Sequence, residues 1–392
     1  MVVLAVSEDN RPTSLAEPGL AGPEGPAPEA RLDNYANTSR NRLNRWTARE
    51  FLWTFSENAR CRKCGRVTVS GDGSVGVRAD GTSVGFTGLA TCGSVWVCPV
   101  CNSRIQAVRR LEVGVALANL HANGGGAAFG AITVRHHRGQ ALGTVLEGLT
   151  YGMARIGRDK TVKQLRDSMG YIGRIQALEV TFGANGPHPH RHPLVMFSRP
   201  PDASALAHLH LAEFRAFSAG VTKKGLESPL DIAQMLMPVV PGTEETLGDY
   251  FAKAEYSFDA AAWEATATQT KKGKKGSRTP WEVLDSARFK GDADDLAIWN
   301  DYEKTMKGKR ALTYTRGLRD LLGLGQEATD EEIADAEVGD AEDTGFRVSD
   351  WTPVQRRAEL GAQLMNVVTP AGHWAAGREF CRNNGIPIEE LS

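Results

Sequence analysis

The chain has 392 residues, of which 41% are hydrophobic and 24% are charged, and its formal net charge is −1. This length and composition predict a globular protein with one sizeable core and room for a second, small one. No apolar stretch approaches the roughly 20 residues that cross a bilayer, and the first residues lack the pattern of a secretory signal. We therefore expect no membrane-spanning helix and a cytoplasmic location.

The small net charge hides an uneven distribution of charge along the chain. Residues 101–178 contain eleven Lys or Arg and four acids, whereas 326–350 contain ten acids and one Arg. The middle of the chain therefore favours phosphate binding, although a single charge run is more often a solvated helix surface. For the acidic stretch at 327–342, a solvated surface and a mimic that keeps nonspecific DNA away both remain open.

The first hundred residues are expected to form a tail and a small module. Residues 1–40 are predicted to be a disordered tail, because 8–31 are rich in Pro, Gly, Ala and Glu. Thr47 and Glu50 form a capping-box pattern, which predicts a helix from there to about Ala59. Short apolar runs separated by Gly-Asp turns follow and predict small hairpins. We expect 41–102 to form a helix and a cysteine-rich zinc module.

The central region, 103–260, is predicted to be a catalytic domain. Its pattern reads as a helix from Ser103, a strand, one or two helices, two strands joined at Asn185-Gly186, and a further helix. This order predicts an α+β fold in which helices cover one face of an antiparallel sheet. The expected strands are 129–135, 175–182 and 188–197, and the expected helices are 103–119, one or two within 140–168, and 203–219.

The last part of the chain is expected to be a basic loop with a helical region, 261–345, and a C-terminal tail, 346–392. The loop carries a lysine cluster that suits contacts with backbone phosphates, although a plain solvent-exposed loop fits it equally well. Arg135, at the end of the first central strand, is a further candidate for DNA contact. The lysines of the cluster are Lys271, Lys272, Lys274 and Lys275.

Three histidines alternate in the second strand of the predicted hairpin: His188, His190 and His192. Alternate residues of a strand share one face, and a turn at Asn185-Gly186 would place Glu179 opposite His192 on that face. Imidazoles beside a carboxylate suit Mg²⁺ or Mn²⁺ acting on phosphate, and two His also suit Zn²⁺. We predict His190, His192 and Glu179 as ligands, with His188 as a substitute.

A predicted helix further along the chain carries Tyr250 and, one turn later on the same face, Lys253. A phenol is a weak nucleophile at neutral pH, so it needs a polarised phosphate, a nearby cation or a base. Lys253 would supply the cation, and Asp249 or Glu245 the base. Alone, this pattern is ordinary helix surface, and its weight comes from the histidine cluster.

Two cysteine pairs, Cys61 with Cys64 and Cys98 with Cys101, each have the spacing of a zinc knuckle. A cytoplasmic chain keeps its thiols reduced, so a Cys₄ zinc site is favoured over disulfides. The gap between the pairs exceeds the usual spacing of a zinc ribbon, which requires an inserted hairpin. Cys92 is an alternative ligand, whereas Cys381 is expected to be buried without a metal.

Three motifs of this chain resemble those of plasmid rolling-circle replication initiators (Rep), in the single-tyrosine branch of the HUH endonuclease superfamily. The motifs are FGAITVRHH (129–137), LEVTFGANGPHPHRHPLVMF (178–197) and DYFAK (249–253), and they occur in the order found in that family. Further similarity runs through CGSVWVCPVCNSRI, RTPWEVL and RALTYTRGLRDLL. The resemblance covers roughly residues 60–340.

The resemblance implies a ferredoxin-like or RRM-like HUH domain and a metal-dependent, single-strand DNA endonuclease and ligase. His190 and His192 would hold Mg²⁺ or Mn²⁺, and Tyr250 would attack the scissile phosphate with help from Lys253. The products would be a 5′-phosphotyrosine and a free 3′-hydroxyl that primes plasmid replication, and rejoining would end it. The expected partners are single-stranded or hairpin origin DNA and the host helicase, polymerase and single-strand binding protein, with no membrane.

Two departures from the family pattern stand out. Arg191 replaces the usual hydrophobic residue between the histidines, and Thr246 stands where some relatives place a carboxylate. Tyr256 is a weaker nucleophile candidate, because residues six apart on a helix point to opposite sides. An HUH relaxase or transposase would use the same chemistry, and a zinc-ribbon DNA-binding protein without catalysis is the alternative from another class.

Overall fold

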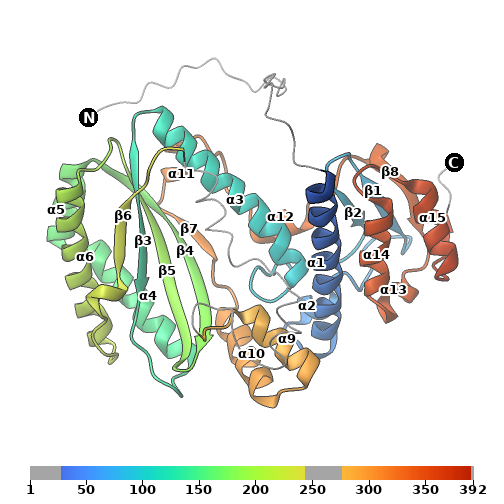
Figure 1. The fold of residues 1–392 in the computed structure, drawn as a ribbon, viewed down its shortest axis with the longest axis horizontal. Helices are drawn as coiled ribbons and strands as arrows, with labels where there is room; N and C mark the ends of the chain where they lie inside the picture. Colours follow the sequence, from blue (N-terminus) through green and yellow to red (C-terminus); the bar gives the residue numbers. More distant parts are fainter. Residues whose placement is uncertain (1–27, 243–275, 390–392) are drawn as a thin grey trace.

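A computed structural model describes residues 28–242 and 276–389, and side chains from residue 39 onward. It confirms the α+β class, because helices pack against two antiparallel sheets (Figure 1). The strands are β1 (Val75–Ala79), β2 (Val84–Thr87), β3 (Gly126–Thr133), β4 (Tyr171–Gly183), β5 (Gly186–Phe197), β6 (Met235–Pro238), β7 (Leu312–Tyr314), β8 (Thr344–Val348) and β9 (Ile388–Glu389).

The helices alternate with these strands along the chain. The longer ones are α1 (Pro28–Phe55), α3 (Pro99–Ala122), α4 (Leu142–Arg158), α5 (Lys160–Met169), α6 (Ala203–Lys223), α9 (Pro280–Lys290), α10 (Ala293–Met306), α14 (Glu359–Val368) and α15 (Trp374–Asn383). The short ones are α2 (Ala59–Lys63), α11 (Leu318–Leu321), α12 (Asp330–Asp335), α13 (Thr352–Arg356) and two 3₁₀ turns, Asp231–Ala233 and Ala341–Asp343. None of the helices in the described ranges is long and apolar enough to span a membrane.

The larger sheet has the strand order β6-β3-β5-β4-β7, and all its neighbours are antiparallel. Helices cover both of its faces, whereas the sequence predicted helices on one face. Alternate residues such as Ala128, Val195 and Leu178 pack with α4 and α6 on one side. The intervening residues, including Ala177 and Leu194, pack against α3 on the other side. The central strands β3, β4 and β5 therefore bury residues on both of their faces, which explains their long apolar runs.

The smaller sheet joins distant parts of the chain in the order β2-β1-β8-β9. Val77 in β1 pairs with Phe346 in β8, and both side chains are fully buried. The residues expected to form a C-terminal tail thus complete this sheet and pack α14 and α15 against it as a second core. The tail prediction failed here because the strands of 346–389 are short and their partners lie far away in sequence.

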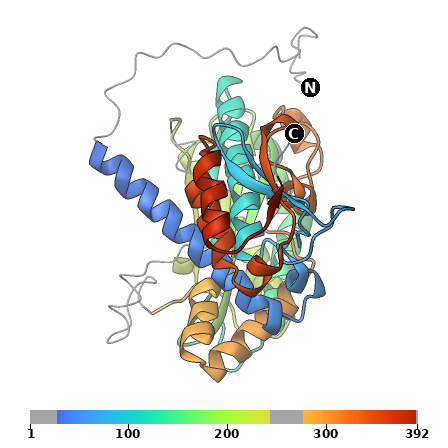
Figure 2. The ribbon, with the colours of Figure 1, turned by 90° about the vertical axis from the view of Figure 1, so that its right-hand side faces the viewer.

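Helix α1 stands between the two sheets (Figures 1 and 2) and packs against α2, α3, α9 and α14. Its Ala48 and Leu52 belong to one core, whereas Trp46 and Trp53 belong to the other. The helix begins at Pro28, inside the expected disordered tail, so Thr47 is not an N-cap. The Thr47 hydroxyl donates back to the carbonyls of Leu43 and Asn44, as helix-interior threonines do.

The acidic stretch at 327–342 is tied to the cysteine-rich part of the chain by ion pairs. Asp330 accepts from Arg109 at 3.0 Å, and Glu337 lies 2.8 Å from Arg78. Glu331 lies 3.2 Å from Arg60. Charges that looked like solvated surface in the sequence therefore help to hold α12 against α3 and β1.

Candidate metal site and cysteine cluster

Strands β4 and β5 place three side chains on one sheet face. Glu179 lies directly opposite His190, and His192 lies opposite Ala177. The sequence predicted a turn at Asn185-Gly186 and Glu179 opposite His192. The turn residues are instead Ala184 and Asn185, and Gly183 pairs with Gly186. The expected register was therefore wrong by two residues, which leaves every side chain on its predicted face because strands alternate with period two.

The Glu179 carboxylate lies between the two imidazoles. Its Oε2 is 2.9 Å from His190 Nε2 and 3.1 Å from His192 Nε2. Burial alone would raise the pKa of Glu179, but the hydrogen bonds and charges of the two histidines outweigh it and hold the pKa well below its usual range. Glu179 is therefore an anion throughout the neutral pH range and can act as a ligand.

The surroundings of this group limit how its rings move. Phe129 stacks on His192 with ring centroids 5.8 Å apart, and His192 is only 5% exposed. His188 contacts the Thr133 hydroxyl and lies beside His136 with centroids 4.7 Å apart. Burial and the charges of His190 and His136 lower the pKa of His188 to about 4. His188, kept as a substitute ligand in the sequence prediction, lies outside the three-residue group.

The group formed by Glu179, His190 and His192 has the composition of an open metal site. One ligand atom of each residue lies within 4.8 Å of the other two. Two imidazoles and one carboxylate leave coordination positions open for a substrate oxygen or water. His190 and Glu179 are partly exposed, so the open side faces the surface. The donor set therefore fits a divalent cation.

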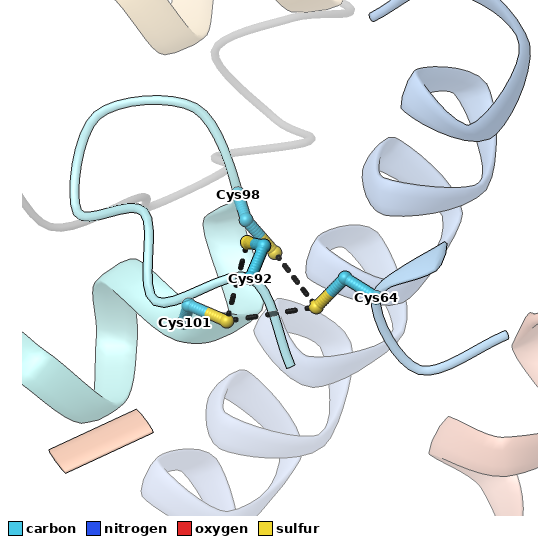
Figure 3. A group of neighbouring side chains, drawn as sticks. All are labelled: Cys64, Cys92, Cys98 and Cys101. Carbon is cyan, nitrogen blue, oxygen red and sulfur yellow. Dashed lines mark hydrogen bonds between the residues drawn. The ribbon is translucent and has the colours of Figure 1, made fainter. Parts of the chain in front are cut away.

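A second cluster consists of four buried cysteines, Cys64, Cys92, Cys98 and Cys101 (Figure 3). Cys64 Sγ lies 3.7 Å from Cys98 Sγ and 3.6 Å from Cys101 Sγ, and Cys92 Sγ lies 3.6 Å from Cys101 Sγ. Four thiolates about 2.3 Å from one zinc ion would be roughly 3.8 Å apart, so these separations fit a tetrahedral site. Hydrogen bonds from the neighbouring thiols lower the pKa of Cys101.

The four-cysteine group contains Cys92, whereas the sequence prediction placed Cys61 in it. Cys61 lies within the short helix α2, and Cys64 caps the end of that helix. Cys61 is buried and close to Cys92 without joining the group. The backbone N–H of Ser94 donates to Cys92 Sγ at 3.5 Å. The loop after β2 therefore brings Cys92 to the position that knuckle spacing assigned to Cys61.

Several predicted residues lie outside the described ranges: Tyr250, Lys253, Asp249 and Glu245, and the lysines of the basic loop, Lys271, Lys272, Lys274 and Lys275. Arg135 is described, and it forms an ion pair with Glu227 at 2.8 Å. His137 shares that carboxylate at 2.9 Å. Arg135 is thus neutralised by a protein carboxylate, which weakens it as a phosphate contact.

A set of basic residues that the sequence analysis did not single out lies at the end of α10. Lys304, Lys307 and Lys309 are exposed, and none forms an ion pair with any described residue. They border a cavity of about 600 Å³ that is also lined by Trp96 and Arg310. The Trp96 indole donates to the Lys309 carbonyl at 2.7 Å, so the cysteine-rich loop helps to position this segment. The spacing of these three lysines in the sequence does not distinguish them from the lysines of an ordinary solvent-exposed helix.

Comparison with known proteins places the chain beside replication proteins of the Rep type. Over 346 aligned residues it is 29% identical to a Streptomyces lividans protein named Protein rep, covering 71% of this chain and 75% of the relative. This similarity confirms the predicted resemblance to plasmid Rep initiators. The assignment to the single-tyrosine HUH branch stays a prediction.

A second relative is similar over a shorter stretch. It is named Neomycin resistance protein, from Streptomyces cyanogenus, and is 31% identical over 134 residues, or 28% of this chain and 31% of the relative. No family model matches the chain, and no solved structure gives a significant match.

Proposed function

We propose that the chain is a plasmid replication initiator that nicks one strand of the origin DNA and rejoins it when replication ends. The observation that carries the proposal is the convergence of His190, His192 and Glu179 on one sheet face. The similarity to a Rep protein over most of the chain supports replication rather than a relaxase or transposase, which would share the chemistry.

In this proposal the described residues would hold a cation, and the cation would contact the scissile phosphate. His190, His192 and Glu179 would bind Mg²⁺ or Mn²⁺, which supplies charge neutralisation for a phosphate oxygen. Glu179 would bind the cation as a carboxylate anion, and the stacking of Phe129 restricts rotation of the His192 ring. The cysteine cluster would hold a structural Zn²⁺ next to the loop that carries Trp96.

Tyr250 is the proposed nucleophile. Its oxygen forms a bond to the phosphorus while the bond to the 3′ oxygen breaks, so that a 5′-phosphotyrosine and a free 3′-hydroxyl result. Lys253 would stabilise the phenolate, and Asp249 or Glu245 would accept the proton.

Nicking of a supercoiled plasmid that carries the cognate origin tests the proposal. In Mn²⁺ or Mg²⁺ the protein should relax the plasmid and remain attached to the cut 5′ end. Tyr250→Phe should abolish both properties, and Glu179→Gln or His190→Gln should slow nicking by more than about 100-fold, because each removes one ligand.

Matched substitutions control for general damage. Tyr256→Phe removes a nearby phenol, and His208→Gln removes an exposed histidine of α6. Both should leave nicking unchanged. Undiminished nicking by Tyr250→Phe would contradict the assigned nucleophile, and undiminished nicking by Glu179→Gln would contradict the assigned metal site.

A further inference from the structure

A cavity of about 460 Å³ lies between the cysteine cluster, α1 and the smaller sheet. Ligand-binding pockets have volumes of roughly 300–1,000 Å³, so this cavity has room for a small molecule or a chain segment. Its walls come from α1, β1, β2 and the loop that follows it, the start of α3, the end of α12, β8 and α14. The described residues of the candidate metal site, Glu179, His190 and His192, do not line it.

Positive charge dominates the lining of this cavity. Among its Arg, Asp and Glu side chains, four arginines, Arg49, Arg78, Arg104 and Arg347, face two acids, Asp335 and Glu337, which leaves an excess of two positive charges (four minus two) before the lining cysteines Cys64 and Cys101 are counted. Glu337 is paired with Arg78 at 2.8 Å. Asp335 is exposed and accepts from Thr91 at 3.0 Å. The other three arginines have no carboxylate partner among the residues that the structure describes.

Arg49 is the most unusual of the four. It is only 3% exposed, yet its Nε and Nη2 have no acceptor within the described part of the chain. Its guanidinium lies 3.9 Å from the Trp46 ring centroid and presses against Gly65, where an added Cβ would be 2.1 Å from Nη1. Burying an unpaired guanidinium is costly, so a buried Arg ordinarily has an anionic partner.

Arg104 and Arg347 are less buried than Arg49, and each has N–H donors that are not used in the bonds described next. Arg104 donates to the Ala334 carbonyl at 3.0 Å, and Arg347 donates to the Ser74 hydroxyl at 3.1 Å. These bonds use one nitrogen of each guanidinium and fix its direction. The Thr87 hydroxyl also lines the cavity. Planar guanidiniums with hydroxyls beside them match the oxygens of a phosphate group, which Arg recognises bidentately.

We propose that this cavity binds the phosphate group of a nucleotide, either free or within a DNA strand. Arg49 would supply the buried contact, and Arg104 and Arg347 would close around the remaining oxygens. The site goes beyond the proposed nicking activity and does not depend on it, because it uses none of the residues assigned to cleavage.

Isothermal titration calorimetry on the zinc-loaded full-length protein tests the site, in buffer without Mg²⁺ or Mn²⁺ so that no nicking occurs. The probes are inorganic phosphate, thymidine 5′-monophosphate and a thymidine 12-mer without terminal phosphates. The double variant Arg104→Gln/Arg347→Gln should bind at least one probe about 100-fold more weakly, because each charged contact contributes about tenfold. Arg49 is not substituted, because it packs against Trp46 and Gly65 and its loss could impair folding as well as binding.

The control variant Arg357→Gln/Arg382→Gln removes the same charge from exposed positions outside the cavity and should bind like the wild type. If the cavity variant binds only the 12-mer more weakly, the bound phosphate belongs to a DNA strand. If it binds the monophosphate or inorganic phosphate more weakly, the site takes a free ligand. The proposal is overturned if the wild type binds no probe, or if the cavity variant matches the control with every probe.

Discussion

Cys92 and Cys61 differ in role although both are buried beside the same cluster. Sequence spacing favours Cys61, because it forms a knuckle with Cys64, whereas the separations between sulfur atoms select Cys92. Cys61 lies within a five-residue helix and Cys64 caps the end of that helix, and only Cys64 of the two belongs to the four-cysteine group. Motif spacing counts residues and does not report the direction of a side chain.

This difference gives a prediction for zinc content. Cys92→Ser should lower bound zinc from about one ion per chain to well below that value and should reduce thermal stability, because a structural zinc site contributes folding energy directly. Cys61→Ser should keep the zinc. Elemental analysis of protein purified without chelators measures both. Zinc loss in Cys61→Ser with retention in Cys92→Ser would reverse the assignment.

At the level of elements, the β4–β5 hairpin depends on one glycine in a left-handed conformation. Gly186 has φ +92°, whereas Gly183, its partner across the hairpin, lies in ordinary extended backbone. A Cβ at either position meets nothing closer than 3.5 Å. Backbone conformation therefore distinguishes the two glycines, and crowding does not.

Gly186→Ala should therefore destabilise the hairpin by about 1–2 kcal/mol, the usual cost of a left-handed non-glycine residue. Hydrogen–deuterium exchange of amides in 171–197 should speed up by roughly 5- to 30-fold if these amides exchange through local opening. Gly183→Ala is the matched control and should change exchange little. Equal effects of the two substitutions would show that the turn differs from the one described.

Helix α6 is held to α5 by a buried ion pair, and two further arginines, Arg174 and Arg191, lie in the same part of the protein. Glu213 accepts from Arg166 at 2.6 Å, and both side chains are buried. Burial and the charge of Arg166 lower the pKa of Arg174, and burial and the charge of Arg174 lower that of Arg191 to about 10. Glu213 therefore offsets the positive charges of Arg166 and Arg174.

Glu213→Gln should lower the free energy of unfolding by about 3–5 kcal/mol, because it leaves Arg166 buried without its partner. Urea denaturation followed by circular dichroism measures the change. Glu147→Gln removes the same charge from an exposed pair with Lys224 and should have little effect. A comparable loss in both variants would indicate general electrostatic destabilisation and contradict a specific role for the buried pair.

Much of the larger sheet was predictable from the sequence, because its strands are long and its signals are local. The alternating histidines and the hairpin turn lie within a few residues of each other, so one face could be assigned even with the register wrong by two. The smaller sheet was not predictable in this way. Phe346 and Val77 become partners only in three dimensions, and the cavity arginines come from four separate segments.

For the whole molecule, the net charge of −1 is a poor guide to DNA binding because charges are segregated. Four of the eight acids in 327–342 form ion pairs with arginines, namely Glu327, Asp330, Glu331 and Glu337, whereas Lys304, Lys307 and Lys309 remain exposed near the cysteine-rich loop. A DNA strand that enters beside this loop would meet three exposed lysines along one wall of the cavity of about 600 Å³, and none of the three is ion-paired with a described residue.

Substituting all three lysines with Gln should weaken binding of single-stranded DNA at low salt. The slope of log K against log salt should fall by about 2, because each phosphate contact on a single strand contributes roughly 0.7. The control Lys160→Gln/Lys163→Gln/Lys223→Gln removes equal charge from α5 and α6 and should keep the slope. Fluorescence anisotropy across a salt series measures both, and identical slopes would exclude the α10 lysines from the DNA path.

The pairing of β1 with β8 has a consequence for synthesis in the cell. Strand β1 leaves the ribosome long before β8, the strand that covers its edge, because β8 is made only after the whole larger sheet. Until then the nascent chain exposes an unpaired strand edge, a known route to aggregation. Chains that stop before β8 would therefore lack a partner for β1, so premature termination should yield insoluble fragments rather than a smaller working protein.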